Sequence, residues 1–153
     1  MSVVEERLKE LGIELPDVPS SLANYVGAAR TGNLIYLSGR LPMREGQVAY
    51  KGKLGRDVSA EDGSQAARLA ALNVVATLRA EVGDLDRVKR VVKLSGMVAS
   101  DPEFTEQASV LNGASDVLVE IFGEKGRHAR AAFGVAALPM NACVEIDMIV
   151  EVG

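Results

Sequence analysis

Apolar residues recur along the chain with two periods, one typical of helices and the other typical of strands. Spacings of three and four residues predict helices over residues 4–11, 59–82 and 101–122, each followed by a glycine. Ser59, with Asp62 three residues later, resembles a helix-capping arrangement at the start of the longest of these helices. The inner face of the third helix is expected to carry Phe104, Leu111, Leu118, Ile121 and Phe122.

Segments with strand character lie between these helices and after the last one. Residues 28–31 and 34–38 flank Gly32-Asn33, a pair that permits the positive φ of a tight hairpin turn. The segment 88–99 is rich in β-branched residues and predicts a long strand, and one more short strand is expected around Val48. Two further strands follow the third helix, and a short turn containing Pro139 is expected to join them as a closing hairpin.

This closing hairpin is expected to bring two opposite charges together. In its first strand Arg130 and Ala132 share one face, and in its second strand Glu145 and Asp147 share a face opposite to the apolar residues. Pairing of the two strands would put Arg130 and Glu145 on the face away from the core. We therefore expect these two side chains to meet in a cleft.

The order of two strands, helix, strand, helix and two strands predicts an α+β fold, with a mixed sheet and two main helices packed on one of its faces. One domain is expected over residues 1–153, with a helical N-terminal extension over residues 1–20. The other face of the sheet would stay uncovered within one chain, so self-association is expected. The small or apolar residues expected to face it include Ala132, Gly134, Ala136 and Cys143.

Composition and charge narrow the class of protein. The chain has 153 residues, 48% of them hydrophobic, which suffices for one aliphatic core. A formal charge of −4, with a basic run confined to residues 87–90, argues against a nucleic-acid binder. One histidine (His128) and one cysteine (Cys143) do not supply the ligands of a zinc site, and no metal or cofactor is expected. Without a secretory signal or a long apolar stretch, a cytoplasmic protein that makes no membrane contact is expected.

The order of helices and strands, together with three local sequence motifs, resembles that of one protein family. Tyr25 with the segment 32–39 (Gly-Asn-Leu-Ile-Tyr-Leu-Ser-Gly), Asn112 in the third helix, and Arg130 through Leu138-Pro139 to Glu145 are similar to signatures of the RidA/YjgF proteins. These are also called the reactive-intermediate deaminase or L-PSP endoribonuclease family. The likeness runs from about Tyr25 to the C-terminus. It implies a chorismate-mutase-like fold and a homotrimer with three clefts between its subunits.

The resemblance also implies an activity, the hydrolysis of reactive 2-imino acids and their enamine tautomers to 2-keto acids and ammonia. Carried over residue by residue, Arg130 would grip the carboxylate of the substrate and Glu145 would position or activate a water molecule. Tyr25, Gly39 and Asn112 would line the site. No cofactor takes part in this chemistry.

Other interpretations of these residues stay open on the sequence. Arg130 would serve equally well to pair with Glu145 or with an acid of another subunit, and Glu145 could be a solvated strand residue. Tyr25 could cover a subunit interface, and Asn112 could bond a neighbouring loop. His128 is expected in an exposed loop, and Cys143 is expected to be a small buried residue.

The chain departs from the family pattern at three places. It has Ala23-Asn24 where the family usually has Gly-Pro, Arg40 where many members have Gln, and Ala132 where many have Cys. The departures at Ala23-Asn24 and Ala132 favour, as an alternative function, a non-catalytic trimer that binds small carboxylates for regulation. A second alternative is an endoribonuclease or translation inhibitor, against which the acidic net charge speaks.

Overall fold

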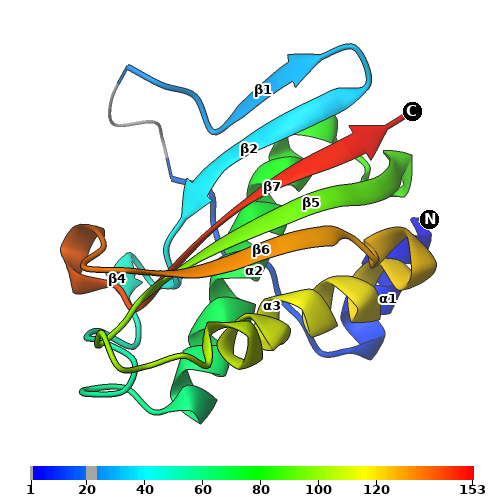
Figure 1. Cartoon of the computed structure of the whole chain (residues 1–153). Helices are drawn as coiled ribbons and strands as arrows, with labels where there is room; N and C mark the ends of the chain where they lie inside the picture. The colour runs from blue at the N-terminus through cyan, green and yellow to red at the C-terminus, as the bar shows by residue number, and fades with distance from the viewer. Residues whose placement is uncertain (1, 20–23) are drawn as a thin grey trace.

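A five-stranded sheet, covered on one face by two long helices, forms the body of the chain (Figure 1). The computed structural model describes residues 2–19 and 24–153, so Ala23 and the two ends of the expected extension lie outside the described residues. The helices are α1 (Val3–Glu10), α2 (Ala60–Val82) and α3 (Gln107–Phe122), with short 3₁₀ turns η1 (Leu85–Arg87), η2 (Gly123–Gly126) and η3 (Pro139–Asn141). The strands are β1 (Ala28–Thr31), β2 (Leu34–Arg40), β3 (Met43–Arg44), β4 (Gln47–Val48), β5 (Val88–Ala99), β6 (Ala129–Val135) and β7 (Val144–Val152).

The last strand of the chain, β7, lies in the middle of the large sheet. The strand order is β1-β2-β7-β5-β6, and β3 pairs with β4 in a separate small hairpin. All neighbours in the large sheet are antiparallel except β5 and β6, which run parallel. A parallel pair needs a long crossover connection, and α3 supplies it. The expected α+β fold with a mixed sheet is confirmed.

The expected closing hairpin is wrong. β6 and β7 follow each other in sequence but do not pair, because β5 lies between them. After β6, the turn η3 carries the chain past the end of β5, and β7 then inserts between β5 and β2 (Figure 1). Alternation along a strand determines which face is buried, but it does not determine which strand lies alongside.

The two faces of the sheet differ in cover. Along β7, alternate residues are fully buried, and this face packs against α2. The residues between them, including Glu145 and Asp147, point to the face that the two long helices leave uncovered. On this open face Tyr36 and Phe133 are each 46% exposed. Ala132 and Cys143, which we expected on this face, pack instead against the core.

The helices follow the predicted positions with one difference. Ser59 caps α2 by accepting a hydrogen bond from the backbone N–H of Asp62 at 3.1 Å, as expected. α3 begins at Gln107, so Phe104 lies in the preceding turn and outside the helix. Phe104 still packs against the core from this turn. Among the described residues, no helix has the length and apolar character that crossing a membrane requires.

The N-terminal helix is tied to the body of the protein through Asp86. The carboxylate of Asp86 accepts hydrogen bonds from the backbone N–H groups of Val3 and Val4, at 2.8 and 2.9 Å, and from the hydroxyl of Ser2 at 2.8 Å. These bonds favour the ionised carboxylate and hold the pKa of Asp86 below its ordinary value. They satisfy N–H groups that the first turn of a helix otherwise leaves unpaired.

Candidate functional site

Arg130 lies on the edge strand β6, and its side chain points to the helix-covered face of the sheet. Its strand position is in register with Leu94, which is fully buried on that face. The guanidinium reaches α3, where Nη1 donates to Asn112 Oδ1 at 2.9 Å and to Ser115 Oγ at 3.1 Å. Nη2 lies 3.4 Å from the carbonyl oxygen of Ala108, to which it donates a long hydrogen bond.

These three acceptors form one stripe on α3. Ala108, Asn112 and Ser115 are four and three residues apart, the spacing that places residues on one side of a helix. All three acceptors are neutral, and among the described residues no carboxylate forms an ion pair with Arg130. The guanidinium is therefore fixed in place while its positive charge is left uncompensated.

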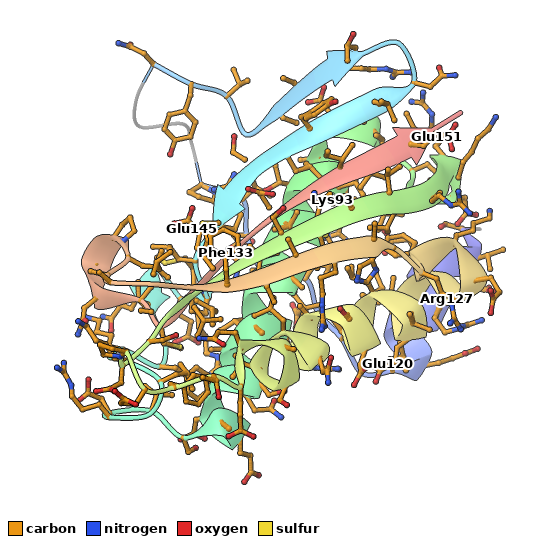
Figure 2. All side chains as sticks on the ribbon, viewed as in Figure 1. Lys93, Glu120, Arg127, Phe133, Glu145 and Glu151 are labelled. Atoms are coloured by element: carbon orange, nitrogen blue, oxygen red, sulfur yellow. The ribbon has the colours of Figure 1, made fainter. Side chains whose placement is uncertain are left out.

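Glu145 lies on the opposite, open face of the sheet. It is half-buried on β7, in register with Met97 of β5, which in turn is in register with Phe133 of β6. Figure 2 shows Glu145 and Phe133 at the same end of the sheet. Because Arg130 points to the other face, the expected meeting of Arg130 and Glu145 does not occur within one chain.

Gly39 and Tyr25 belong to the same end of the sheet as Glu145. A Cβ atom at Gly39 would overlap the Glu145 carboxylate and lie 3.1 Å from its carboxyl carbon, so the glycine makes room for this side chain. Ser38 donates from its hydroxyl to the carbonyl of Val26 at 2.6 Å, which holds the segment of Tyr25 beside Gly39. The expected site residues thus form two groups, Arg130 with Asn112 and Glu145 with Gly39, and Tyr25 lies in the segment that is held beside Gly39.

Tyr25 also borders a cavity of about 360 Å³ between β1, β2 and α2. Arg40, Thr77 and Glu81 line this cavity as well. The Nε atom of Arg40 is buried there without a hydrogen-bond partner. Arg40, which stands where many family members have Gln, therefore places its positive charge on the helix-covered side of β2, away from Glu145.

Burial shifts the acid on the open face toward its neutral form. It raises the pKa of Glu145, and the neighbouring Asp147 carboxylate raises it further. Burial also raises the pKa of Asp147, against the opposing effects of a hydrogen bond from Ser95 and the charge of Lys93. A carboxylate with a raised pKa takes a proton from water more readily, which suits a general base.

Replacing Glu145 by Gln is expected to stabilise the chain at neutral pH and to leave its stability unchanged in acid. The pKa of Glu145 is higher in the folded chain than its ordinary value of 4.5, so the folded state binds more protons than the unfolded state. Wild-type stability therefore falls as the pH rises from about 4.5 through the folded pKa, and Gln removes this loss. Thermal unfolding of both proteins at about pH 4 and about pH 7 measures the difference. An equal difference at both pH values would contradict the prediction.

The sequence did not identify two residues next to Arg130, namely Ser115 and His128. His128, expected in an exposed loop, is half-buried, with Nε2 at 2.9 Å from Ser115 Oγ and Nδ1 at 2.6 Å from the carbonyl oxygen of Gly126. The spacing of Asn112 and Ser115 on one helix face was visible in the sequence. The approach of His128 was not visible, because it depends on how the loop before β6 folds over α3.

The cysteine and the metal-ligating residue types add no further chemistry here. Cys143 is fully buried, as expected, and burial raises the pKa of its thiol to about 11, so the reactive thiolate does not form near neutral pH. In residues 2–19 and 24–153, no three His, Cys, Asp or Glu side chains gather in a way that could hold a metal ion.

Comparison with known proteins identifies the family. A family profile described as "YjgF/chorismate_mutase-like, putative endoribonuclease" matches residues 5–152 of this chain. The chain belongs to the YjgF/chorismate-mutase-like family. A relative in the same length range is the protein TCP17 of Trypanosoma cruzi, which is 48% identical over 149 residues, 97% of this chain and 93% of TCP17.

Solved structures of similar proteins confirm the chorismate-mutase-like fold. Atu1372 of Agrobacterium tumefaciens, a protein described as having unknown function, is 53% identical with a TM-score of 0.93, and the match covers 99% of this chain and 93% of that one. A "putative endoribonuclease" of Shewanella oneidensis is 37% identical with a TM-score of 0.94, over 97% of this chain and 99% of that one. The fold of this YjgF-family chain is therefore the one that the sequence motifs implied.

Proposed function

We propose that this chain hydrolyses reactive 2-imino acids to 2-keto acids and ammonia, in clefts between the subunits of a homotrimer. The observation that carries the proposal is the guanidinium of Arg130. It is held by neutral acceptors on α3 and has no carboxylate partner among the described residues. A fixed and uncompensated guanidinium matches the charge and planar shape of a substrate carboxylate.

The opposite orientations of Arg130 and Glu145 support a shared cleft. Their side chains leave opposite faces of one sheet, and β5 separates their strands. Both can touch one small molecule only if two subunits contribute. In the proposed cleft, Arg130 and Asn112 of one subunit therefore face Glu145, Gly39 and Tyr25 of the next. The open face of the sheet, with Tyr36 and Phe133 exposed, provides apolar surface for the contact.

Imine hydrolysis in this cleft needs one water molecule and one base. Arg130 holds the carboxylate of the imino acid, and Glu145 accepts a proton from the water whose oxygen adds to the imine carbon. The proton then passes from Glu145 to the nitrogen of the carbinolamine. Glu145 then takes the proton of the hydroxyl group and delivers it to the nitrogen as the C–N bond breaks, so that ammonia leaves and the keto group forms. Imino acid and water thus yield keto acid and ammonia.

Names of more distant relatives agree with a small-molecule site. RidA of the Antarctic bacterium Psychrobacter is 26% identical with a TM-score of 0.61. TdcF of Escherichia coli, 20% identical and similar in fold, was solved with bound serine, an amino acid that carries a carboxylate. One relative favours a second candidate function: a protein of Lactococcus lactis, 26% identical over 89% of this chain, is named "Putative regulator AldR". A regulatory protein would bind the same carboxylates without turnover.

Mixing two inactive variants is expected to restore activity. Arg130→Ala and Glu145→Gln each destroy one half of every cleft. In a mixed trimer, one cleft combines an intact Arg130 with an intact Glu145 from different subunits. Random mixing in equal amounts should therefore recover roughly a quarter of the wild-type rate of 2-iminobutanoate hydrolysis. Mass spectrometry under native conditions serves as the control that subunits have exchanged.

The outcomes of this mixing experiment separate the candidate functions. Recovery of activity supports both the hydrolase and the shared cleft. Mixed trimers that stay inactive, while the wild type is active, would show that both residues act from the same subunit. A wild-type protein that binds 2-ketobutanoate but does not accelerate imine hydrolysis would instead support the regulatory function.

A further inference from the structure

Four groups beside the proposed carboxylate site form a continuous chain of hydrogen bonds. Arg130 Nη1 donates to Ser115 Oγ at 3.1 Å, Ser115 Oγ lies 2.9 Å from His128 Nε2, and His128 Nδ1 lies 2.6 Å from the carbonyl oxygen of Gly126. We call these four groups the Arg130–Gly126 chain. It joins the last loop before β6 to α3 and ends at the guanidinium. In Figure 2 this region lies near the labels of Arg127, in the loop, and Glu120, on α3.

The direction of each hydrogen bond follows from the chemistry of the groups. A carbonyl oxygen only accepts, so Nδ1 of His128 carries the proton that is donated to Gly126. In the neutral imidazole ring Nε2 is then an acceptor, and it receives the hydroxyl proton of Ser115. The oxygen of Ser115 is left to accept from Arg130. All the bonds therefore run the same way, and each polarises the next.

The end of this chain is anchored in the backbone. A Cβ atom at Gly126 would overlap the Leu118 carbonyl oxygen and lie 2.7 Å from its carbonyl carbon, so the glycine allows η2 to rest against α3. Gly126 is buried, and its carbonyl oxygen is thereby fixed relative to the helix that carries Ser115. The imidazole of His128 is held between two points of one rigid body.

The hydrogen bonds select which edge of the guanidinium stays available. Asn112 and Ser115 occupy both N–H groups of Nη1, and Ala108 takes one N–H of Nη2. Nε–H shares one edge of the planar group with an N–H of Nη2. Nε–H has no hydrogen-bond partner among the described residues, and Nη2 makes only the long bond to Ala108. Two parallel donors on one edge match the two oxygens of a carboxylate.

We propose that His128 and Ser115 are positioning residues, which fix Arg130 so that it presents its Nε/Nη2 edge to the carboxylate of the substrate. This inference rests on the proposed function, because it assumes that Arg130 binds a carboxylate. Without His128, the hydroxyl of Ser115 turns to other acceptors such as a backbone carbonyl of its own helix. The guanidinium then loses part of its support and samples other orientations.

Nuclear magnetic resonance tests the arrangement independently of any activity. We expect the ¹⁵N spectrum of His128 to show a protonated Nδ1 and an unprotonated Nε2. Rotation of the Arg130 guanidinium about its Nε–Cζ bond should be slow in the wild type and faster in His128→Ala. Asp116→Ala, an exposed change next to Ser115 on α3, should leave both signals unchanged. A proton on Nε2, or a guanidinium that rotates freely in the wild type, would overturn the arrangement.

Kinetics tests the consequence for the substrate. His128→Ala and Ser115→Ala should each raise KM for 2-iminobutanoate about fivefold with kcat nearly unchanged, because one neutral hydrogen bond supports binding in all states. His128→Gln can still accept from Ser115 through its side-chain oxygen and should restore most of the affinity. The double variant His128→Ala/Ser115→Ala should be no worse than either single variant, since both act through the same chain.

The results distinguish failure of this inference from failure of the proposed function. If the wild type is active and Arg130→Ala is not, but His128→Ala keeps the wild-type KM, the positioning role is wrong and the hydrolase stands. If the wild type has no activity, the proposed hydrolase is wrong. The positioning role is then tested by two measurements that need no turnover, the rotation of the Arg130 guanidinium and the affinity for 2-ketobutanoate. If both are the same in His128→Ala as in the wild type, the positioning role is refuted.

Discussion

Replacing Arg130 by Ala is expected to lower kcat/KM for 2-iminobutanoate by about 100-fold or more, because the substrate carboxylate loses two charged hydrogen bonds of about 1.5–3 kcal/mol each. The chain should still fold, since Arg130 lies on the edge strand and its guanidinium is attached to the surface of α3. Arg130→Lys keeps the charge but not the two-donor edge, so it should recover only a small part of the loss.

A trapping assay measures this effect. A pyridoxal-phosphate-dependent dehydratase generates 2-iminobutanoate, and semicarbazide captures whatever the protein has not hydrolysed. Wild type should suppress semicarbazone formation and Arg130→Ala should not. Arg127→Ala removes a neighbouring exposed arginine of the preceding loop and should behave as wild type. Equal suppression by wild type and Arg130→Ala would remove Arg130 from the site.

Replacing Gly113 by Ala is expected to destabilise the chain by about 3 kcal/mol, a cost typical of forcing extra volume into a packed contact. At Gly113, α3 lies directly against the backbone of α2. A Cβ atom there would overlap the backbone carbonyl oxygen of Ser64 and lie 2.8 Å from its carbonyl carbon. Backbone atoms of a long helix cannot move aside as the end of a side chain can, so the two helices must separate.

A matched glycine on the other helix provides the control. At Gly63 of α2 the new Cβ would meet mainly the side chain of Leu54, at 2.7 Å from Cδ1, and this flexible side chain can move aside. Both glycines lie inside helices, so the gain of about 1 kcal/mol in helix propensity is the same for the two variants. Gly63→Ala should therefore lose less than Gly113→Ala. Urea unfolding, followed by circular dichroism at one protein concentration, gives both values. Equal midpoints for the two variants would refute the close approach at Gly113.

The sequence predicted the two faces of β7 correctly, but not the faces of β6 or the pairing of the two strands. The alternation around Ile146 and Met148 correctly separated the buried side of β7 from the side of Glu145. The pairing of β6 with β7 was wrong, because a short connection between two strands favours a hairpin and nothing in the local pattern shows that β5 comes between them. Strands that are far apart in sequence can pair with the same strand edge, so the neighbours of β6 and β7 depend on the packing of the whole sheet.

The candidate site was predictable to a similar degree. Resemblance to the family pointed to Arg130 and Asn112, and the structure brings them within hydrogen-bond distance. It also pointed to Gly39 and Glu145, which the structure places side by side. The partners Ser115 and His128 were missed, since a serine in a helix and a histidine in a loop carry no local signal of their meeting. The separation into two groups followed only from the face to which each strand turns its side chains.

The central position of β7 also governs how the chain can fold as it is synthesised. Leu34 of β2 pairs with Glu151 of β7, so the sheet cannot close until β7 has left the ribosome. Until then the edges of β2 and β5 that β7 will join remain open and able to pair with other chains. A nascent chain stalled before Val144 would therefore carry two unfilled strand edges and depend on chaperones to stay out of aggregates.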